Sequence, residues 1–244
     1  LKGQGVTPVE DPSNADPRFQ RIAFRQSRDV FEALGLTSER LADTAKRLQK
    51  ARDVLDTLAD DSFAKLIKRK PSGLIFLDRK AFQALSEDIG MRVLRRVLAF
   101  YRPFPPRQSA VDRLYQFIIA GQTGRKTMAG QIVSVKKSEV QVFRELADID
   151  QTRQAAPKGR TVVWDARFKV KISKKIAGHY VITPLGEKGL KWVRDKGIPL
   201  PKEPAIALQG LACVRPVLEN KKLGKPIAIA GILTHSGVII DLLP

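Results

Sequence analysis

The hydrophobic pattern changes its period near residue 121, and this change constrains the fold more than any other feature of the chain. Before it, apolar residues such as Leu41 and Leu48 recur at helical spacing. After it, the short runs 132–135 and 140–143 indicate the two strands of a hairpin. We therefore predict an α+β fold, with a helical N-terminal domain followed by a β-rich C-terminal domain. The expected parts are residues 1–35, 36–121 and 122–244.

A stretch of strict alternation predicts one strand over residues 164–172. Its even positions are apolar, and its odd positions include Arg167, Lys169 and Lys171. Such a row is typical of a solvated sheet face, or of lysines that prevent pairing with another sheet edge. It is also suited to contact the phosphates of a nucleic acid.

The chain carries a formal net charge of +19 at pH 7. Residues 1–60 are balanced, and the excess is spread over the rest of the chain. This distribution indicates a broad positive surface on a folded protein rather than a basic tail. It favours a polyanionic partner, either nucleic acid or an anionic membrane. We favour nucleic acid and predict no membrane partner, because the apolar faces of the expected helices point toward a core.

Composition excludes several kinds of site. A single cysteine, Cys213, rules out an intramolecular disulfide framework and a cysteine-based zinc site. The two histidines leave little room for a histidine-rich centre, so we predict no metal site. We also expect neither a membrane-spanning segment nor a secretory signal, and hence a cytoplasmic location. Because the chain starts with Leu1 rather than Met, we expect a piece of a longer protein or a trimmed product.

The most specific motif lies near the start, where the turn-forming segment 9–16 is followed by Arg21 and Arg25. One interpretation is an Asx-type turn that leads into a capped helix. The other is a phosphate clamp, because two arginines four residues apart share a helix face and can bind phosphate in a bidentate manner. The residues alone leave both interpretations open.

This motif, Asp-Pro-Ser-Asn-x-Asp at 11–16 followed by the two arginines, resembles the signature of the bacterial tRNA(Ile)-lysidine synthetase family. Segments 92–101, 125–132 and 142–145 resemble later parts of the family in the same order. In broad outline the resemblance covers residues 6–175. The chain departs from the family at Ile22, where Asn is usual, and in lacking the ATP-binding Ser-Gly-Gly-x-Asp-Ser loop.

The resemblance implies the C-terminal half of such an enzyme, without its nucleotide-binding half. In the parent enzyme, ATP, expected with Mg²⁺, adenylates C2 of the wobble cytidine in a tRNA(Ile) with a CAU anticodon. The amine of free lysine then displaces AMP and forms lysidine. Residues 1–35 would close the catalytic domain and connect it onward, 36–121 would form a helical substrate-binding domain, and 122–244 a β-rich tRNA-binding domain. We expect no cofactor and no activity in this chain alone.

The resemblance gives no residue of this chain a catalytic role. It places four residues at the edge of the active site: Asp11, Asn14, Arg21 and Arg25. Basic side chains elsewhere are candidates for tRNA contacts: Arg92, Arg95, Arg96, Lys136, Lys137, Arg144, Arg167, Lys169, Lys171, Lys174 and Lys175. The alternative from a different class is a stand-alone, non-catalytic RNA-binding protein. The sequence also leaves a homodimer open.

Overall fold

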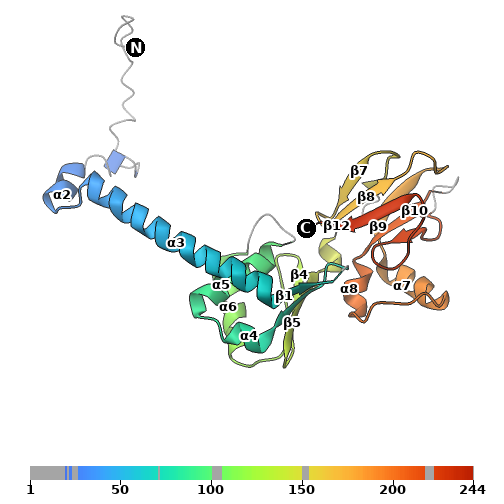
Figure 1. The fold of residues 1–244 in the computed structure, drawn as a ribbon, viewed down its shortest axis with the longest axis horizontal. Helices are drawn as coiled ribbons and strands as arrows, with labels where there is room; N and C mark the ends of the chain where they lie inside the picture. Colours follow the sequence, from blue (N-terminus) through green and yellow to red (C-terminus); the bar gives the residue numbers. More distant parts are fainter. Residues whose placement is uncertain are drawn as a thin grey trace, which may run out of the picture. The chain divides into compact units, whose positions relative to one another are not determined.

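The computed structural model describes residues 20, 22–23, 27–70, 72–100, 106–149, 154–217 and 223–243. The chain divides into two compact units, Leu1–Leu55 and Asp56–Pro244. Helices lie mainly in the N-terminal part of the described chain and strands mainly in the C-terminal part, so the predicted α+β class is confirmed (Figure 1). In these residues, no helix combines the length and apolarity needed to cross a bilayer.

Local sequence signals mark the end of the first described helix and the start of the next. Helix α2 spans Arg28–Ala33, and Gly35 then adopts a φ of 76°, a conformation that favours glycine because it has no Cβ. The Thr37 hydroxyl accepts a hydrogen bond from the backbone N–H of Arg40 at 3.3 Å. This contact caps helix α3, Ser38–Leu66, which continues into the second unit.

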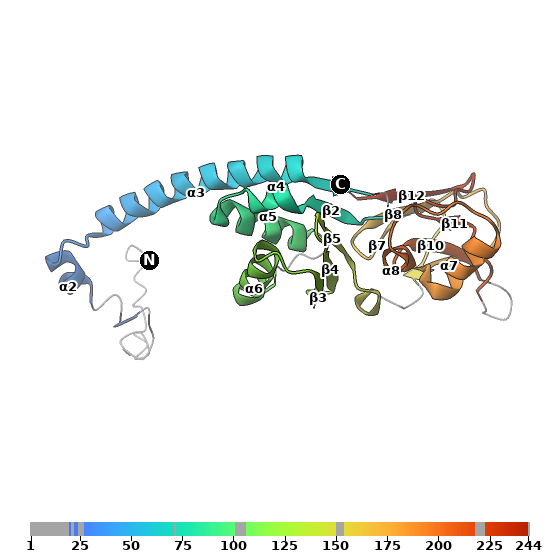
Figure 2. The ribbon, with the colours of Figure 1, turned by 90° about the horizontal axis from the view of Figure 1, so that it is seen from below.

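The second unit contains a five-stranded antiparallel sheet in the order β1-β2-β5-β4-β3. Three helices cover one face of this sheet and bury their apolar stripes against it (Figure 2). The strands and helices are β1 (Ile67–Arg69), β2 (Ile75–Asp78), α4 (Arg79–Gln83), α5 (Glu87–Ala99), α6 (Gln108–Ile119), β3 (Gly124–Met128), β4 (Gln131–Val135) and β5 (Glu139–Arg144). The predicted hairpin is confirmed as β4 and β5.

This sheet takes strands from both sides of residue 121. Strands β1 and β2 precede helices α4 to α6, whereas β3, β4 and β5 follow them. The central pairing joins β2 to β5, with Ile75 opposite Val142 and Leu77 opposite Val140. The predicted boundary between residues 121 and 122 lies between α6 and β3. Both predicted domain boundaries, 35/36 and 121/122, stay a prediction.

Arg79 links the C-terminal end of helix α6 to the sheet through hydrogen bonds. Its side chain is buried, and its Nε and Nη2 donate to the Ile118 carbonyl at 3.1 Å and 2.6 Å. Its Nη1 donates to the Lys136 carbonyl at 2.8 Å. Carbonyls in the last turn of a helix lack partners within the helix. The guanidinium therefore satisfies one of them and ties α6 to the β4–β5 turn.

The remaining strands form two further antiparallel sheets around a shared core, in the orders β11-β10-β9-β6 and β12-β8-β7 (Figure 1). Trp164, Phe168, Ile182 and Val214 are among its buried side chains. The elements are η3 (Leu146–Asp148), β6 (Gln154–Ala155), β7 (Thr161–Trp164), β8 (Phe168–Ile172), β9 (Tyr180–Pro184), α7 (Gly186–Asp195), α8 (Ala205–Gln209), β10 (Ala212–Pro216), β11 (Ala228–Ile229) and β12 (Val238–Leu242).

The prediction of one continuous strand over 164–172 is wrong. The chain reverses at Asp165 and Ala166, whose φ angles are 49° and 51°, and Trp164 pairs with Phe168 across the resulting hairpin of β7 and β8. Positive φ at both central residues is typical of the tight turns that join antiparallel strands. The alternation misled because Trp164 and Phe168 are both buried, so the apolar period of two continues through the turn.

Candidate functional site

The four residues predicted at the active-site edge, Asp11, Asn14, Arg21 and Arg25, lie outside the residues that the structure describes. Their role stays a prediction from the resemblance. The predicted tRNA-binding residues all lie in the described part of the second unit. The structure separates them into buried, paired and exposed groups.

Arg144 and Arg167 are buried around one carboxylate, that of Asp165. Arg144 Nη2 lies 2.8 Å from Asp165 Oδ1, and Arg167 Nε lies 2.6 Å from Asp165 Oδ2. The Arg144 and Arg167 side chains are only 6% and 3% exposed. This corrects the expectation that Arg167 shares an exposed face with Lys169 and Lys171. The β7–β8 turn directs Arg167 inward, so neither arginine belongs to a phosphate-binding surface.

Two of the α5 arginines are paired with aspartates of helix α3. Arg92 Nη1 lies 2.8 Å from Asp56 Oδ1, and Arg96 Nε lies 2.6 Å from Asp60 Oδ1. Arg96 Nη2 also contacts Asp56 Oδ1 at 3.1 Å. Arg95, by contrast, is exposed. The arrangement accounts for Arg92 and Arg96 as links between two helices and leaves Arg95 as the outward cation of the three.

Four of the predicted lysines form an exposed group that we call the β8 basic face: Lys169, Lys171, Lys174 and Lys175. Lys169 and Lys171 point outward from β8, while the residues between and beside them fill the core. Lys174 follows the strand, and its side chain passes close to the backbone of Gly159. A Cβ added to Gly159 would lie only 2.5 Å from Lys174 Cε. No ion pair engages these four lysines within the described part of the chain. The face is therefore open to an anionic ligand.

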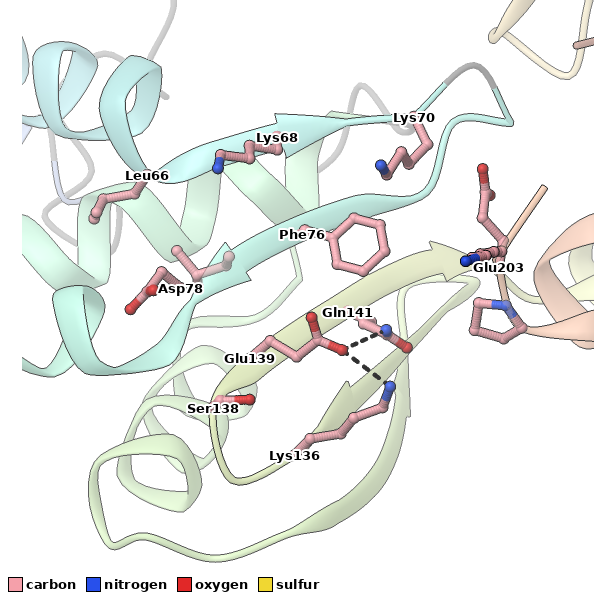
Figure 3. Close-up of a pocket in the computed structure, with 13 residues that line it drawn as sticks. Leu66, Lys68, Lys70, Phe76, Asp78, Lys136, Ser138, Glu139, Gln141 and Glu203 are labelled. Carbon is pink, nitrogen blue, oxygen red and sulfur yellow. Dashed lines mark hydrogen bonds and ion pairs between the residues drawn. The ribbon is translucent and has the colours of Figure 1, made fainter.

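A second basic region lies on the face of the five-stranded sheet that helices α4 to α6 leave open. It is a groove of about 900 Å³, which we call the β1–β2–β5 groove (Figure 3). Segment 202–204 closes one end, where the Ser72 hydroxyl donates to the Glu203 carboxylate. The groove is lined by Leu66, Lys68, Lys70, Phe76, Leu77, Asp78, Lys136, Ser138, Glu139, Gln141, Lys202, Glu203 and Pro204.

Strand register explains which side chains share the floor of the groove. Lys68 lies opposite Phe76 on β2, and Phe76 lies opposite Gln141 on β5. Partners across antiparallel strands project to the same face. Figure 3 shows the Phe76 ring facing into the groove between Lys70 and Gln141. The Lys70 Nζ lies 5.6 Å from the centre of this ring.

Two carboxylates of the groove, those of Glu139 and Glu203, have polar partners. Glu139 Oε1 lies 3.0 Å from Lys136 Nζ and accepts a hydrogen bond from Gln141 Nε2 at 2.7 Å (Figure 3). Burial raises the pKa of the Glu203 carboxyl, although the Ser72 hydrogen bond and the charge of Lys70 act in the opposite direction. The groove thus combines cations, hydrogen-bonding groups and one aromatic ring.

Sequence reasoning missed Lys68, Lys70, Phe76 and Lys202, although it selected Lys136. The local signal was the alternation of Lys68 and Lys70 just before the turn-forming Pro-Ser-Gly segment at 71–73. Read as the first strand of a hairpin with 74–77, it would have placed both lysines on one face. The contribution of Lys202 has no local signal, because it depends on contact between distant segments.

Cys213 does not provide a nucleophile. It is fully buried, and burial raises the pKa of its thiol to about 11, so the thiolate is scarce at neutral pH. Across residues that the structure describes, no three or more histidine, cysteine or carboxylate side chains are grouped to hold a metal ion.

The chain is similar in sequence to several curated bacterial enzymes. No family model matches the chain. It is 26% identical over 197 residues to the tRNA(Ile)-lysidine synthase of Ruegeria pomeroyi, which covers 80% of this chain and 45% of that protein. It is 27% identical over 257 residues to the enzyme of the same name from Rhizobium meliloti, covering 100% of this chain and 51% of the relative. It is 31% identical over 147 residues to the tRNA(Ile)-lysidine synthase of Methylobacterium nodulans, covering 56% of this chain and 43% of the relative.

The chain spans about half the length of the curated relatives it matches, consistent with the predicted C-terminal portion. The resemblance inferred from the sequence is therefore confirmed: over the matched length, the chain is similar to bacterial tRNA(Ile)-lysidine synthases.

Proposed function

We propose that this chain is the tRNA-recognition part of a tRNA(Ile)-lysidine synthase. The similarity to enzymes of that name supports this role, as does the net charge of +19. The substrates of the parent enzyme would be a tRNA(Ile) with a CAU anticodon, ATP with Mg²⁺ and free lysine, in the cytoplasm. The adenylating chemistry would belong to the part that carries the ATP-binding loop.

The observation that carries the proposal is the β8 basic face. Its four lysines project from a strand and the turn that follows it, in a sheet whose other side is anchored in the core. Lys169 and Lys171 are two residues apart, which places them about 7 Å from each other along the strand. The neighbouring strand β12 holds Asp241 opposite Lys169 and Ile239 opposite Lys171. On the other side, β7 holds Val163 opposite Lys169 and Thr161 opposite Lys171, so the two lysines stand out from a mixed sheet face.

Such a surface would position tRNA without reading its sequence. Lysines contact phosphate oxygens as point charges. Most hydrogen bonds between proteins and nucleic acids go to the phosphates and sugars, and these bonds fix the register and orientation of the complex. Selection of tRNA(Ile) would then depend on additional contacts, including those of the predicted active-site edge. The β8 basic face is expected to contribute affinity rather than discrimination.

The test is binding of fluorescently labelled tRNA(Ile) with a CAU anticodon, measured by anisotropy against an elongator tRNA. We expect Lys169→Ala combined with Lys171→Ala to weaken binding of both tRNAs by about tenfold, because two phosphate contacts are lost. The matched control is Lys188→Ala combined with Lys191→Ala, two exposed lysines on α7. Their loss should change affinity by less than about threefold.

Preference for tRNA(Ile) would support the synthase assignment. Equal binding of both tRNAs would leave a general RNA-binding module, with discrimination residing in the nucleotide-binding half of the parent enzyme or nowhere. Absence of binding at low salt, with either tRNA, would overturn the proposal.

A further inference from the structure

We propose that the β1–β2–β5 groove binds an unpaired nucleotide of RNA, with its base stacked on Phe76. This inference rests on the proposed RNA-binding function and adds a second, chemically different contact to the β8 basic face. The β8 basic face would hold phosphates, whereas the groove would hold a base and its own phosphates.

Phe76 provides the stacking surface. It lies between Lys68 and Gln141 across the strands, and it packs against the buried cluster of Leu74, Phe143 and Ala207. Its ring faces the groove (Figure 3). An aromatic side chain fixed on a sheet surface is a recurrent platform for single-stranded RNA, because every base has a π-face that stacks on it.

Polar side chains beside the ring can bind the edge of a base. The Gln141 side chain is held by its 2.7 Å hydrogen bond to Glu139, which is in turn paired with Lys136. Glu139 is thereby oriented before a ligand arrives, and the carboxylate can accept from the amino or imino groups of a base. Ser138 adds a hydroxyl at the same side of the groove.

The charges of the groove favour a nucleotide over a free phosphate. Four exposed lysines line it, but Asp78, Glu139 and Glu203 oppose them. A bare phosphate would meet nearly as many carboxylates as ammonium groups. A nucleotide can instead place its base beside the carboxylates and its phosphates beside the lysines. The lysines are Lys68, Lys70, Lys136 and Lys202.

The shape of the site favours an unpaired nucleotide over a duplex. The bases of a duplex are stacked inside the helix and cannot present a face to Phe76, so the base must be unpaired. A volume of about 900 Å³ lies within the range of sites that enclose a small ligand. Loops and chain ends of a folded RNA supply such nucleotides.

The experiment uses a fluorescently labelled six-nucleotide oligoadenylate and the complete chain. Phe76→Leu keeps an apolar side chain but removes the stacking surface, and we expect about a tenfold loss of affinity. Phe76→Tyr restores an aromatic ring and should bind within about twofold of the wild type. The matched control is Phe117→Leu. Phe117 lies outside the groove but has a similar neighbour, because Lys126 Nζ lies 4.7 Å from the centre of its ring.

A second variant guards against loss of folding in Phe76→Leu. Lys68→Ala combined with Lys70→Ala changes only exposed side chains and should weaken oligoadenylate binding by about tenfold. The charge-matched control, Lys188→Ala combined with Lys191→Ala on α7, should leave oligoadenylate affinity within about twofold. Unchanged oligoadenylate affinity in both groove variants would overturn the inference.

The two proposals fail in different ways. If tRNA binds and the oligoadenylate does not, the groove is not a nucleotide site and the proposed function stands. If neither RNA binds, both proposals fall.

Discussion

At the scale of single residues, Asp165 is a buried carboxylate whose charge is balanced by two buried arginines. Its carboxylate is 5% exposed and lies between two buried guanidiniums. Arg144 also contacts Asp148 at 2.7 Å, and Arg167 donates to the Gly210 carbonyl at 2.6 Å. These contacts connect β5, the β7–β8 turn and the end of α8. Buried charges of this kind are tolerated only when they are fully paired.

We expect Asp165→Asn to lower the free energy of unfolding by about 3–5 kcal/mol, because it leaves two buried guanidiniums short of a counter-charge. Chemical denaturation followed by circular dichroism measures the change. The control is Asp241→Asn on β12, whose side chain is exposed. Its effect should stay within about 0.5 kcal/mol. A loss below about 1 kcal/mol for Asp165→Asn would show that the cluster contributes little.

Cys213 gives a second expectation at this scale. With the pKa of its thiol raised from 9.0 to about 11, the thiolate population near neutral pH falls by about 100-fold, and burial blocks reagents as well. Native protein should therefore react with an aromatic disulfide reagent at least about 100-fold more slowly than denatured protein at pH 8. Fast reaction in the native state would mean that the core around β10 opens readily.

At the scale of elements, the sequence predicted the strands whose side chains are buried and missed those at the exposed edges of a sheet. The hairpin of β4 and β5 was predicted because most of its apolar residues are buried in a core. Strands β1 and β3 were not predicted, and both lie at the edges of their sheet. The residues Gly124–Met128 of β3 are almost entirely exposed, so they carry no apolar alternation. An edge strand is defined by backbone pairing with its neighbour, which no local side-chain pattern records.

The turn between β7 and β8 gives an element-scale prediction. Ala166 holds a φ of 51°, which costs a residue with a Cβ about 1 kcal/mol relative to glycine. Ala166→Gly should therefore raise the free energy of unfolding by about 0.5–1 kcal/mol. Ala110→Gly within α6 should lower it by about the same amount, because glycine weakens a helix. Thermal unfolding of both variants checks the sign, and destabilisation by Ala166→Gly would contradict the strained turn.

At the scale of the whole molecule, the candidate surfaces show what composition can and cannot reveal. The excess positive charge predicted a basic surface, and Lys169 and Lys171 are exposed as expected. Arg144 and Arg167 contribute equally to the net charge but lie inside the protein. Sequence cannot separate these cases, because the burial of Arg144 depends on Asp165, 21 positions away. The groove is likewise assembled from segments near 70, 140 and 203.

Salt dependence reports the charge that the whole molecule presents to RNA. If the four lysines of the β8 basic face each neutralise one phosphate, tRNA affinity should fall by about 100-fold between 50 and 200 mM salt. Anisotropy titrations at both concentrations measure this slope. The Lys169→Ala, Lys171→Ala variant should reduce the logarithmic slope by about two. An unchanged slope would mean that the phosphates are held elsewhere.

The pairing of β2 with β5 also bears on how the chain acquires its structure during synthesis. Ile75 meets Val142 in the middle of the sheet, after three helices have intervened. A nascent chain that has emerged only as far as residue 121 has made helices α4 to α6 but lacks three of the five strands that cover their apolar stripes. Those stripes stay uncovered until β5 leaves the ribosome, and during that interval they are natural ligands for chaperones.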